Sequence, residues 1–140
     1  MTTGGTYTLL LVLPEAATLA VGALGEHHFP AGAYAYTGSA LGSGGFVRVD
    51  RHRRVARGDH DVRHWHVDFL AGHPATDLVD VVTTAADAEC RVARALPPGP
   101  VEGFGASDCD CLSHLAHAES VAALSERVDP AHASLDGSNR

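Results

Sequence analysis

An arginine and a histidine that could handle phosphate chemistry stand four residues apart, at Arg48 and His52. The stretch over 46–57 has the spacing of a helix, and residues four apart on a helix share a face. A guanidinium matches phosphate oxygens in a bidentate geometry, and an imidazole can relay a proton near neutral pH. The pair therefore predicts a helix face that contacts phosphate.

Two tyrosines precede this helix in stretches that favour strands. The apolar run 6–13 is typical of a buried strand, and 33–39 alternates small and aromatic residues, which predicts a strand with one covered face. Tyr7 and Tyr36 are expected to line the same face of one sheet. The alternative is that both tyrosines are ordinary core residues of these strands.

Positive charge gathers around the predicted helix in a chain that is otherwise acidic. All ten basic residues are arginine, and the net charge is −7. Six arginines and three aspartates lie between Arg48 and Arg63, a local charge of +3 that leaves −10 for the rest. Such a basic island suits a face that meets a polyanion. A solvated helix face is the alternative, and the three-residue spacing of Arg48, Arg51 and Arg54 fits it.

Length and composition favour one domain with a real core. The chain has 140 residues, of which 45% are hydrophobic. No run approaches the roughly 18 apolar residues of a membrane span, and residues 1–5 lack the features of a signal peptide. We therefore expect a cytoplasmic protein with no membrane partner. The absence of lysine and the excess of aspartate suggest adaptation to very high salt.

The order of elements predicts an α+β fold in which helices flank a small, mostly antiparallel sheet. The strand 6–13 is expected to form a hairpin with 18–24, and 25–32 is expected as a loop. The further expected elements are the strand 33–39, the helices 46–57 and 63–73, the strand 77–85 and the helix 88–96. We expect the domain to span 1–118 and to be followed by a polar C-terminal tail over 119–140, as a short helix or disordered.

The triplets GTY at 5–7 and YTG at 36–38, followed by Arg48-x3-His52, resemble the paired signature of the GIY-YIG nuclease superfamily. A narrower resemblance covers nearly the whole folded part and rests on the blocks "FPAGAYAYTGSALG", "RHWHVDFL" and "GFGASDCDCLSHL". These blocks look like a small, largely archaeal branch of GIY-YIG-like proteins. Members of that branch are sometimes fused to endonuclease III-type repair enzymes.

The resemblance implies a metal-dependent endonuclease that hydrolyses phosphodiester bonds, with DNA favoured over RNA and a role in repair or processing. The catalytic residues that it implies are Tyr7, Tyr36, Arg48 and His52. The tyrosines would position or deprotonate the attacking water, and a phenol with its ordinary pKa near 10 needs help from a metal or an arginine. Glu89 would hold one Mg²⁺ or Mn²⁺, hard cations that accept few protein ligands. Its alternative role is a surface ion pair with Arg91 or Arg94.

Nucleic acid would contact Gly38, Ser39, Arg51 and Arg54, and a repair protein is a conceivable partner. The sequence departs from the superfamily at Ser39, where many members carry a lysine. Arg48 lies ten residues after Gly38, which is about two more than in typical repair nucleases. The departures keep a second hypothesis open, a non-catalytic nucleic-acid-binding module. A third is a protein-interaction domain that retains only the scaffold.

Three cysteines without a secreted context argue against a disulfide framework. A Cys₃His zinc site formed by Cys90, Cys109, Cys111 and His114 is an alternative. The one-residue spacing between Cys109 and Cys111 is unfavourable for it, because paired zinc ligands usually stand two residues apart. The other interpretation is a packed loop in which the thiols act as small hydrophobic groups.

Overall fold

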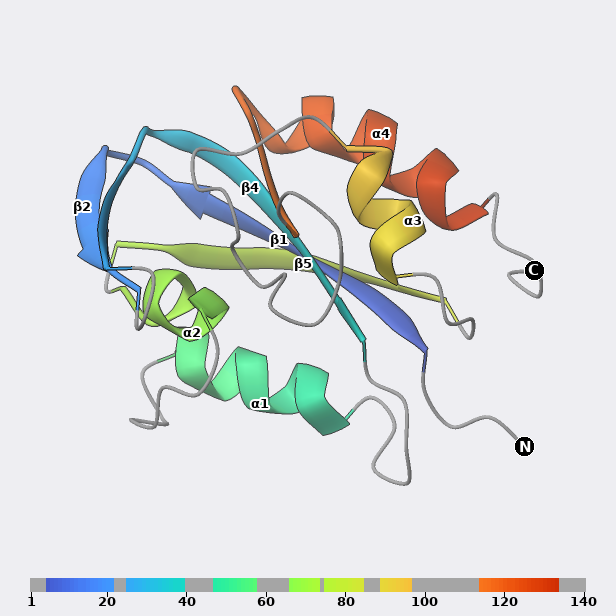
Figure 1. Ribbon diagram of the computed structural model, residues 1–140, viewed down its shortest axis with the longest axis horizontal. Coiled ribbons are helices and arrows are strands. Elements are labelled where there is room, and N and C mark those ends of the chain that lie inside the picture. Colours follow the sequence, from blue (N-terminus) through green and yellow to red (C-terminus); the bar gives the residue numbers. More distant parts are fainter. Residues whose placement is uncertain are drawn as a thin grey trace.

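A computed structural model describes residues 5–21, 25–39, 47–57, 66–73, 75–84, 89–96 and 114–133 (Figure 1). The side chains of eight residues within these ranges lie outside the description: Ser39, Val47, Arg48, His66, Asp68, Glu89, Cys90 and Ala133. Among the described residues, no helix is long and apolar enough to cross a membrane.

The main sheet has four strands in the order β5-β1-β4-β6, and all three pairings are antiparallel. Its strands are β1 (Thr6–Leu13), β4 (Gly32–Ser39), β5 (Asp77–Thr84) and β6 (Leu115–Ala118). The sequence predicted β1, β4 and β5 to within one residue, and β6 was missed. The expected α+β fold with a mostly antiparallel sheet is confirmed.

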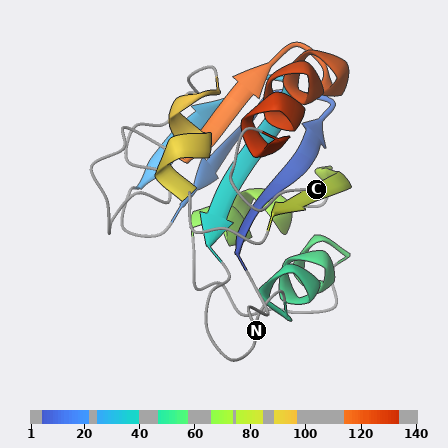
Figure 2. The same cartoon turned by 90° about the vertical axis from the view of Figure 1, so that its right-hand side faces the viewer.

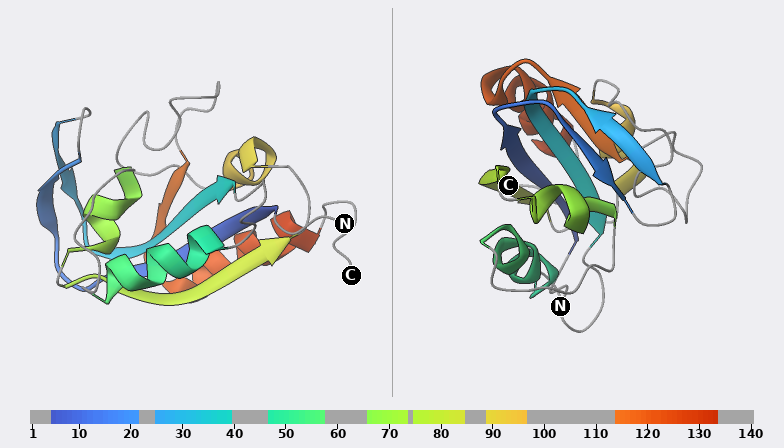
Figure 3. Two further views of the ribbon diagram at one scale, coloured as in Figure 1. Left: turned by 90° about the horizontal axis from the view of Figure 1, so that it is seen from below. Right: turned by 90° about the vertical axis from the view of Figure 1, so that its left-hand side faces the viewer.

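The expected hairpin between the first two strands is wrong. The second strand, β2 (Ala17–Ala20), pairs with β3 (Glu26–Phe29) in a separate two-stranded sheet. Both edges of β1 are already occupied by β4 and β5, so β2 has no edge of β1 to join. The stretch expected as a loop therefore contains β3, which lies with β2 at one end of the main sheet (Figure 3).

Helices cover both faces of the main sheet (Figures 1 and 2). The four helices are α1 (Val47–Ala56), α2 (His66–Ala71), α3 (Glu89–Arg94) and α4 (Val121–Ala133). Side chains alternate between the faces of β1, so Tyr7 and Leu9 face the side of α1 and α2, while Leu10 faces α3 and α4. Two buried clusters result, one on each side of the sheet.

The stretch expected as a polar tail contains the helix α4, which packs on the sheet. Ser120 caps it, because its Oγ accepts a hydrogen bond from the N–H of Ala123 (3.2 Å). Leu124, Val128 and Ala131 are buried against the sheet at helical spacing. The packed part of the chain therefore extends past residue 118, and of the two forms expected for this stretch it takes the helix.

A buried polar network fixes α4 to the sheet on the face that carries Leu10. Thr8 Oγ1 forms hydrogen bonds with Thr37 Oγ1 (3.0 Å) and with His132 Nε2 (2.8 Å). Thr84 Oγ1 bonds to His132 Nδ1 (2.8 Å), so both ring nitrogens have partners on the sheet. Burial lowers the pKa of His132, and the carboxylate of Asp129 partly opposes this shift.

Acidification should therefore weaken the fold through His132. An unfolded histidine titrates near pH 6.5 and binds a proton that the buried residue resists. The contribution of His132 to the free energy of unfolding should not depend on pH above about pH 7.5. Below pH 6.5 it should fall by up to about 1.4 kcal/mol per pH unit. We expect His132→Gln to remove this part of the pH dependence in urea unfolding at pH 7.5, 6.5 and 5.5.

The exposed His28 provides the control, because His28→Gln should leave the pH dependence as in the wild type. An equal loss of stability with falling pH in His132→Gln and the wild type would show that His132 does not carry the effect.

Candidate functional site

Tyr7 and Tyr36 project from neighbouring strands onto the same face of the main sheet. In the register between β1 and β4, Tyr7 lies opposite Gly38 and Leu9 lies opposite Tyr36. The two tyrosines are therefore diagonal neighbours, and their ring centroids are 6.4 Å apart. The sequence-based prediction that they share a face agrees with this geometry.

His52 completes the group from the inner side of α1. The Tyr7 hydroxyl and His52 Nε2 are joined by a hydrogen bond of 2.8 Å. The His52 ring lies 5.4 Å from the Tyr7 ring and 6.2 Å from the Tyr36 ring, centroid to centroid. Three of the four predicted catalytic residues thus meet between the sheet and α1, and we call them the Tyr–His cluster.

The Tyr–His cluster is buried. The exposed fractions of Tyr7, Tyr36 and His52 are 1%, 5% and 0%. The residues His52, Val49 and Val55 follow one another at three-residue spacing and form the inner stripe of α1. The same stripe therefore anchors the helix and places the imidazole against the Tyr7 hydroxyl.

The two tyrosine rings leave no room for a side chain at Gly38. A Cβ atom at this position would lie 2.5 Å from the Tyr7 hydroxyl oxygen, 2.6 Å from Tyr7 Cζ and 3.1 Å from Tyr36 Cε2. Only glycine lets the Tyr7 ring cross β4 at this point. The glycine that the sequence analysis assigned to nucleic-acid contact is buried beneath the cluster.

The arginines of the predicted binding face belong to α1. Arg48 lies in the first turn, one turn before His52, and its side chain is outside the described residues, as is that of Ser39. Arg51 is half-buried and Arg54 is exposed. These two predicted contacts therefore sit on the same helix as the Tyr–His cluster.

The predicted metal ligand Glu89 is the first residue of α3, and its side chain is outside the described residues. Val92 and Leu96 are buried in the cluster on the face opposite α1. Tyr7 belongs to the buried cluster on the other face of the sheet, so the described residues do not bring α3 and the Tyr–His cluster together.

The alternative zinc site falls mainly outside the described part of the chain, which excludes Cys109, Cys111 and the Cys90 side chain. His114 is described and is 3% exposed. Its carbonyl accepts a hydrogen bond from the N–H of Thr37 (2.9 Å). Within the described ranges, no group of three His, Cys, Asp or Glu residues could hold a metal ion.

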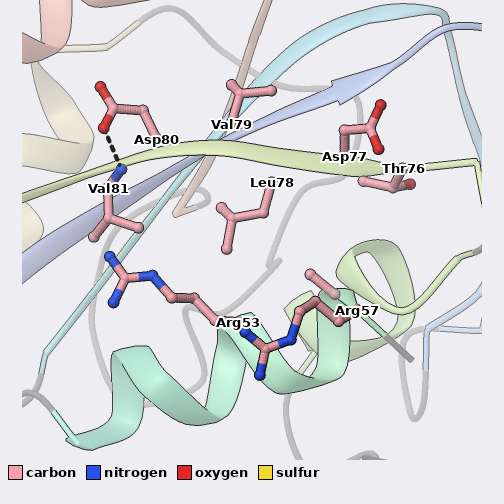
Figure 4. Close-up of a pocket in the computed structure, with 9 residues that line it drawn as sticks. Arg53, Arg57, Thr76, Asp77, Leu78, Val79, Asp80 and Val81 are labelled. Atoms are coloured by element: carbon pink, nitrogen blue, oxygen red, sulfur yellow. Dashed lines mark hydrogen bonds between the residues drawn. The ribbon is translucent and has the colours of Figure 1, made fainter. Parts of the chain in front are cut away.

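Two groups of neighbouring residues in the structure were not predicted from the sequence. The network of Thr8 and Thr84 with His132 brings together residues up to 124 positions apart, so no local pattern could reveal it. Arg53 and Arg57 line a groove beside the edge strand β5 (Figure 4). Their four-residue spacing on the basic helix was the available signal, which the three-residue spacing of Arg48, Arg51 and Arg54 obscured.

The fold and the site define an α+β domain with a central antiparallel sheet, in which tyrosines of two adjacent strands meet a histidine of the following helix. A family model matches residues 6–136, and the chain belongs to this family, the domain of unknown function DUF123. No curated protein matches the chain. No solved structure matches it.

The close contact at Gly38 yields a stability prediction. We expect Gly38→Ala to lower the free energy of unfolding by about 1–3 kcal/mol, because the new methyl group would overlap the Tyr7 ring. In a Tyr7→Leu background the same change should cost less than half as much. Denaturant unfolding of the four proteins in this double-mutant cycle measures the difference. Equal costs in both backgrounds would show that Tyr7 does not set the requirement for glycine.

Proposed function

We propose that this chain is a metal-dependent endonuclease that hydrolyses phosphodiester bonds, with DNA as the favoured substrate, in repair or processing. The observation that carries the proposal is the hydrogen bond between the Tyr7 hydroxyl and His52 Nε2, with Tyr36 beside it. These residues lie at the positions that the resemblance to the GIY-YIG superfamily marks as catalytic.

The geometry supplies a route for proton transfer at the Tyr7 oxygen. If the imidazole carries its proton on Nδ1, Nε2 accepts the hydrogen bond and the phenol donates it. When the phenol proton passes to His52 Nε2, the resulting phenolate oxygen can accept a proton from a water that attacks phosphorus. Such general base catalysis contributes about 10²- to 10⁴-fold to a reaction rate.

Arg48 has the position of a phosphate ligand in this scheme. It begins the turn of α1 that leads to His52, and a guanidinium binds two phosphate oxygens at once. Because the Tyr–His cluster is almost fully buried, a substrate phosphate must approach where the first turn of α1 meets the ends of β1 and β4. Arg51 and Arg54 would then hold the flanking backbone.

Glu89 is the residue that would hold the Mg²⁺ or Mn²⁺. A single carboxylate with waters and substrate oxygens suits these cations, which need few protein ligands. The bound cation would neutralise charge on the phosphate.

A non-catalytic nucleic-acid-binding module is the second candidate. The burial of Tyr7 and His52 favours it, since a buried hydroxyl can serve the core alone. This module would need the arginines of α1 but not Glu89. Phosphate contacts weaken steeply with salt, so in a protein adapted to high salt either function would also rely on stacking, shape or a partner such as a repair protein.

Cleavage of labelled DNA distinguishes the candidates. We expect single-stranded, duplex, flap or abasic DNA to be cut in high KCl only with Mg²⁺ or Mn²⁺. Tyr7→Phe should slow cleavage by about 10²-fold or more, because the phenol is the proposed base. Arg48→Ala should lower the rate by about 10²- to 10³-fold. Glu89→Ala should abolish the cleavage that depends on metal.

Matched variants control for general damage to the fold. Tyr34→Phe removes a buried phenol hydroxyl from the same strand as Tyr36, and Arg91→Ala removes an exposed arginine of α3. Both should cleave within about twofold of the wild type. A wild type that binds DNA without cutting it, with binding lost in Arg48→Ala and kept in Glu89→Ala, would replace the nuclease with the binding module. A wild type that neither binds nor cleaves DNA would contradict both candidate functions.

A further inference from the structure

A pair of threonines lies directly behind the two tyrosines of the Tyr–His cluster. Thr8 follows Tyr7 in β1, Thr37 follows Tyr36 in β4, and the two threonines are opposite each other in the strand register. The sheet separates α1 from α4 (Figure 2). Because successive side chains of a strand point to opposite faces, the threonines face α4, whereas the tyrosines face α1.

A hydrogen bond between the threonine side chains joins β1 to β4 at this point. The two Oγ1 atoms of Thr8 and Thr37 are 3.0 Å apart, and both side chains are fully buried. Two residues further along the same face, the opposite pair of Leu10 and Ala35 is apolar. The hydroxyl pair therefore links the strands at the place where they carry the tyrosines, and such cross-strand pairs stabilise the register.

His132 of α4 extends this link to a third strand. Its Nε2 atom shares a hydrogen bond with Thr8 Oγ1, and its Nδ1 atom shares one with Thr84 Oγ1, both at 2.8 Å. Thr84 is the last residue of β5, which lies on the other side of β1 from β4. The buried imidazole thus connects three adjacent strands through side chains.

The hydrogen bonds of this network depend on one another. Burial lowers the pKa of His132, so its ring is neutral near pH 7 and has one donor and one acceptor nitrogen. If Nε2 donates to Thr8, the Thr8 hydroxyl is free to donate to Thr37. If Nδ1 donates to Thr84 instead, Thr8 donates to Nε2 and accepts from Thr37. A satisfied network of this kind holds its side chains in one arrangement.

Apolar contacts already dock α4 on the sheet. Leu124, Val128 and Ala131 are buried against the same face. Paired polar groups in a core can be replaced by apolar groups of the same shape with little loss of stability. Burial of the helix therefore does not require the polar network, and the network instead determines where the strands lie relative to one another.

The Tyr–His cluster has little tolerance for a displacement of β1 against β4. The Tyr7 ring crosses β4 at Gly38, where a Cβ atom would lie 2.5 Å from the Tyr7 hydroxyl oxygen. The same hydroxyl is 2.8 Å from His52 Nε2. A relative movement of the two strands would therefore press the ring against β4 or lengthen its hydrogen bond to His52.

We propose that His132 is a positioning residue for the Tyr–His cluster, which acts from the opposite face of the sheet through Thr8 and Thr37. It holds β1 and β4 at the separation that lets the Tyr7 hydroxyl meet His52. The role is static, and no change in the network accompanies binding at the cluster. The effect on the cluster follows from the geometry, whereas an effect on cleavage rests on the proposed nuclease function.

Ring ¹⁵N NMR of His52 tests the proposal without any substrate. Thr8→Val removes the hydroxyl and keeps the shape of the side chain, Thr8→Ser keeps the hydroxyl, and His132→Leu removes both ring nitrogens. We expect the His52 Nε2 resonance to move in Thr8→Val and in His132→Leu toward the position of an imidazole without this hydrogen bond. In Thr8→Ser it should stay at the position of the wild type.

Leu124→Ala is the control for a general weakening of α4. It opens a cavity beneath the same helix and leaves the network intact, so denaturant unfolding should show a loss of stability. The His52 resonances of this variant should nevertheless match those of the wild type. Circular dichroism should show that all variants are folded under the conditions of the NMR measurement.

The cleavage assay supplies a second readout. We expect Thr8→Val and His132→Leu to lower kcat by about 10- to 100-fold, because a misplaced reacting group slows the chemical step. KM should stay within about twofold of the wild type, since the arginines of α1 are unchanged. Thr8→Ser and Leu124→Ala should cleave within about twofold of the wild type.

Three results would overturn the proposal: His52 resonances that stay constant in Thr8→Val and His132→Leu, an equal shift in Leu124→Ala, or a Thr8→Ser protein that behaves like Thr8→Val. A wild type that cleaves no DNA, combined with the expected shifts of His52, would support the positioning role and contradict only the nuclease function.

Discussion

The hydrogen bond between Tyr7 and His52 ties the central strand to the helix that follows the second tyrosine strand. The Tyr7 ring can make this contact because it crosses β4 at Gly38, where any larger residue would collide with it. Strand register, glycine position and helix orientation thus depend on one another. The inner stripe of Val49, His52 and Val55 then fixes which arginines of α1 face solvent.

Consecutive residues of β1 serve two different polar networks. Tyr7 meets His52 on one face of the sheet, and Thr8 meets His132 on the other. Since β1 is paired on both edges, it cannot rotate without breaking its backbone hydrogen bonds to β4 or β5. The two networks hold α1 and α4 to a common strand, which couples the rigidity of the candidate site to the C-terminal helix.

Local patterns in the sequence predicted most elements but few of their partners. The apolar run 6–13 and the alternation over 33–39 predicted the strands that carry Tyr7 and Tyr36, and the helical spacing put His52 on the face of Arg48. The partner of β2 could not be predicted, because it depends on which edges of β1 are already occupied. The large apolar residues of α4 are few and stand among alanines and charged residues, so its packing was missed.

The inner stripe of α1 and the groove beside it differ in how far the sequence could predict them. The Tyr–His cluster was expected because Tyr7, Tyr36 and His52 match the paired signature that the sequence shares with the GIY-YIG superfamily. The groove of Arg53 and Arg57 needs the edge position of β5 and the bulge at Val79, which follow from the complete sheet. The described arginines of α1 therefore all lie outside the inner stripe that carries His52.

The proposed nuclease function requires nucleic acid to bind next to the Tyr–His cluster. Long-range ¹H–¹⁵N NMR of the histidine rings, recorded while a short DNA is added without divalent cation, tests it most directly. We expect the resonances of the His52 ring nitrogens to shift in a saturable manner, while those of His132 on the opposite face stay constant. Resonances of His52 that remain unchanged while signals from other bound surfaces shift would contradict it.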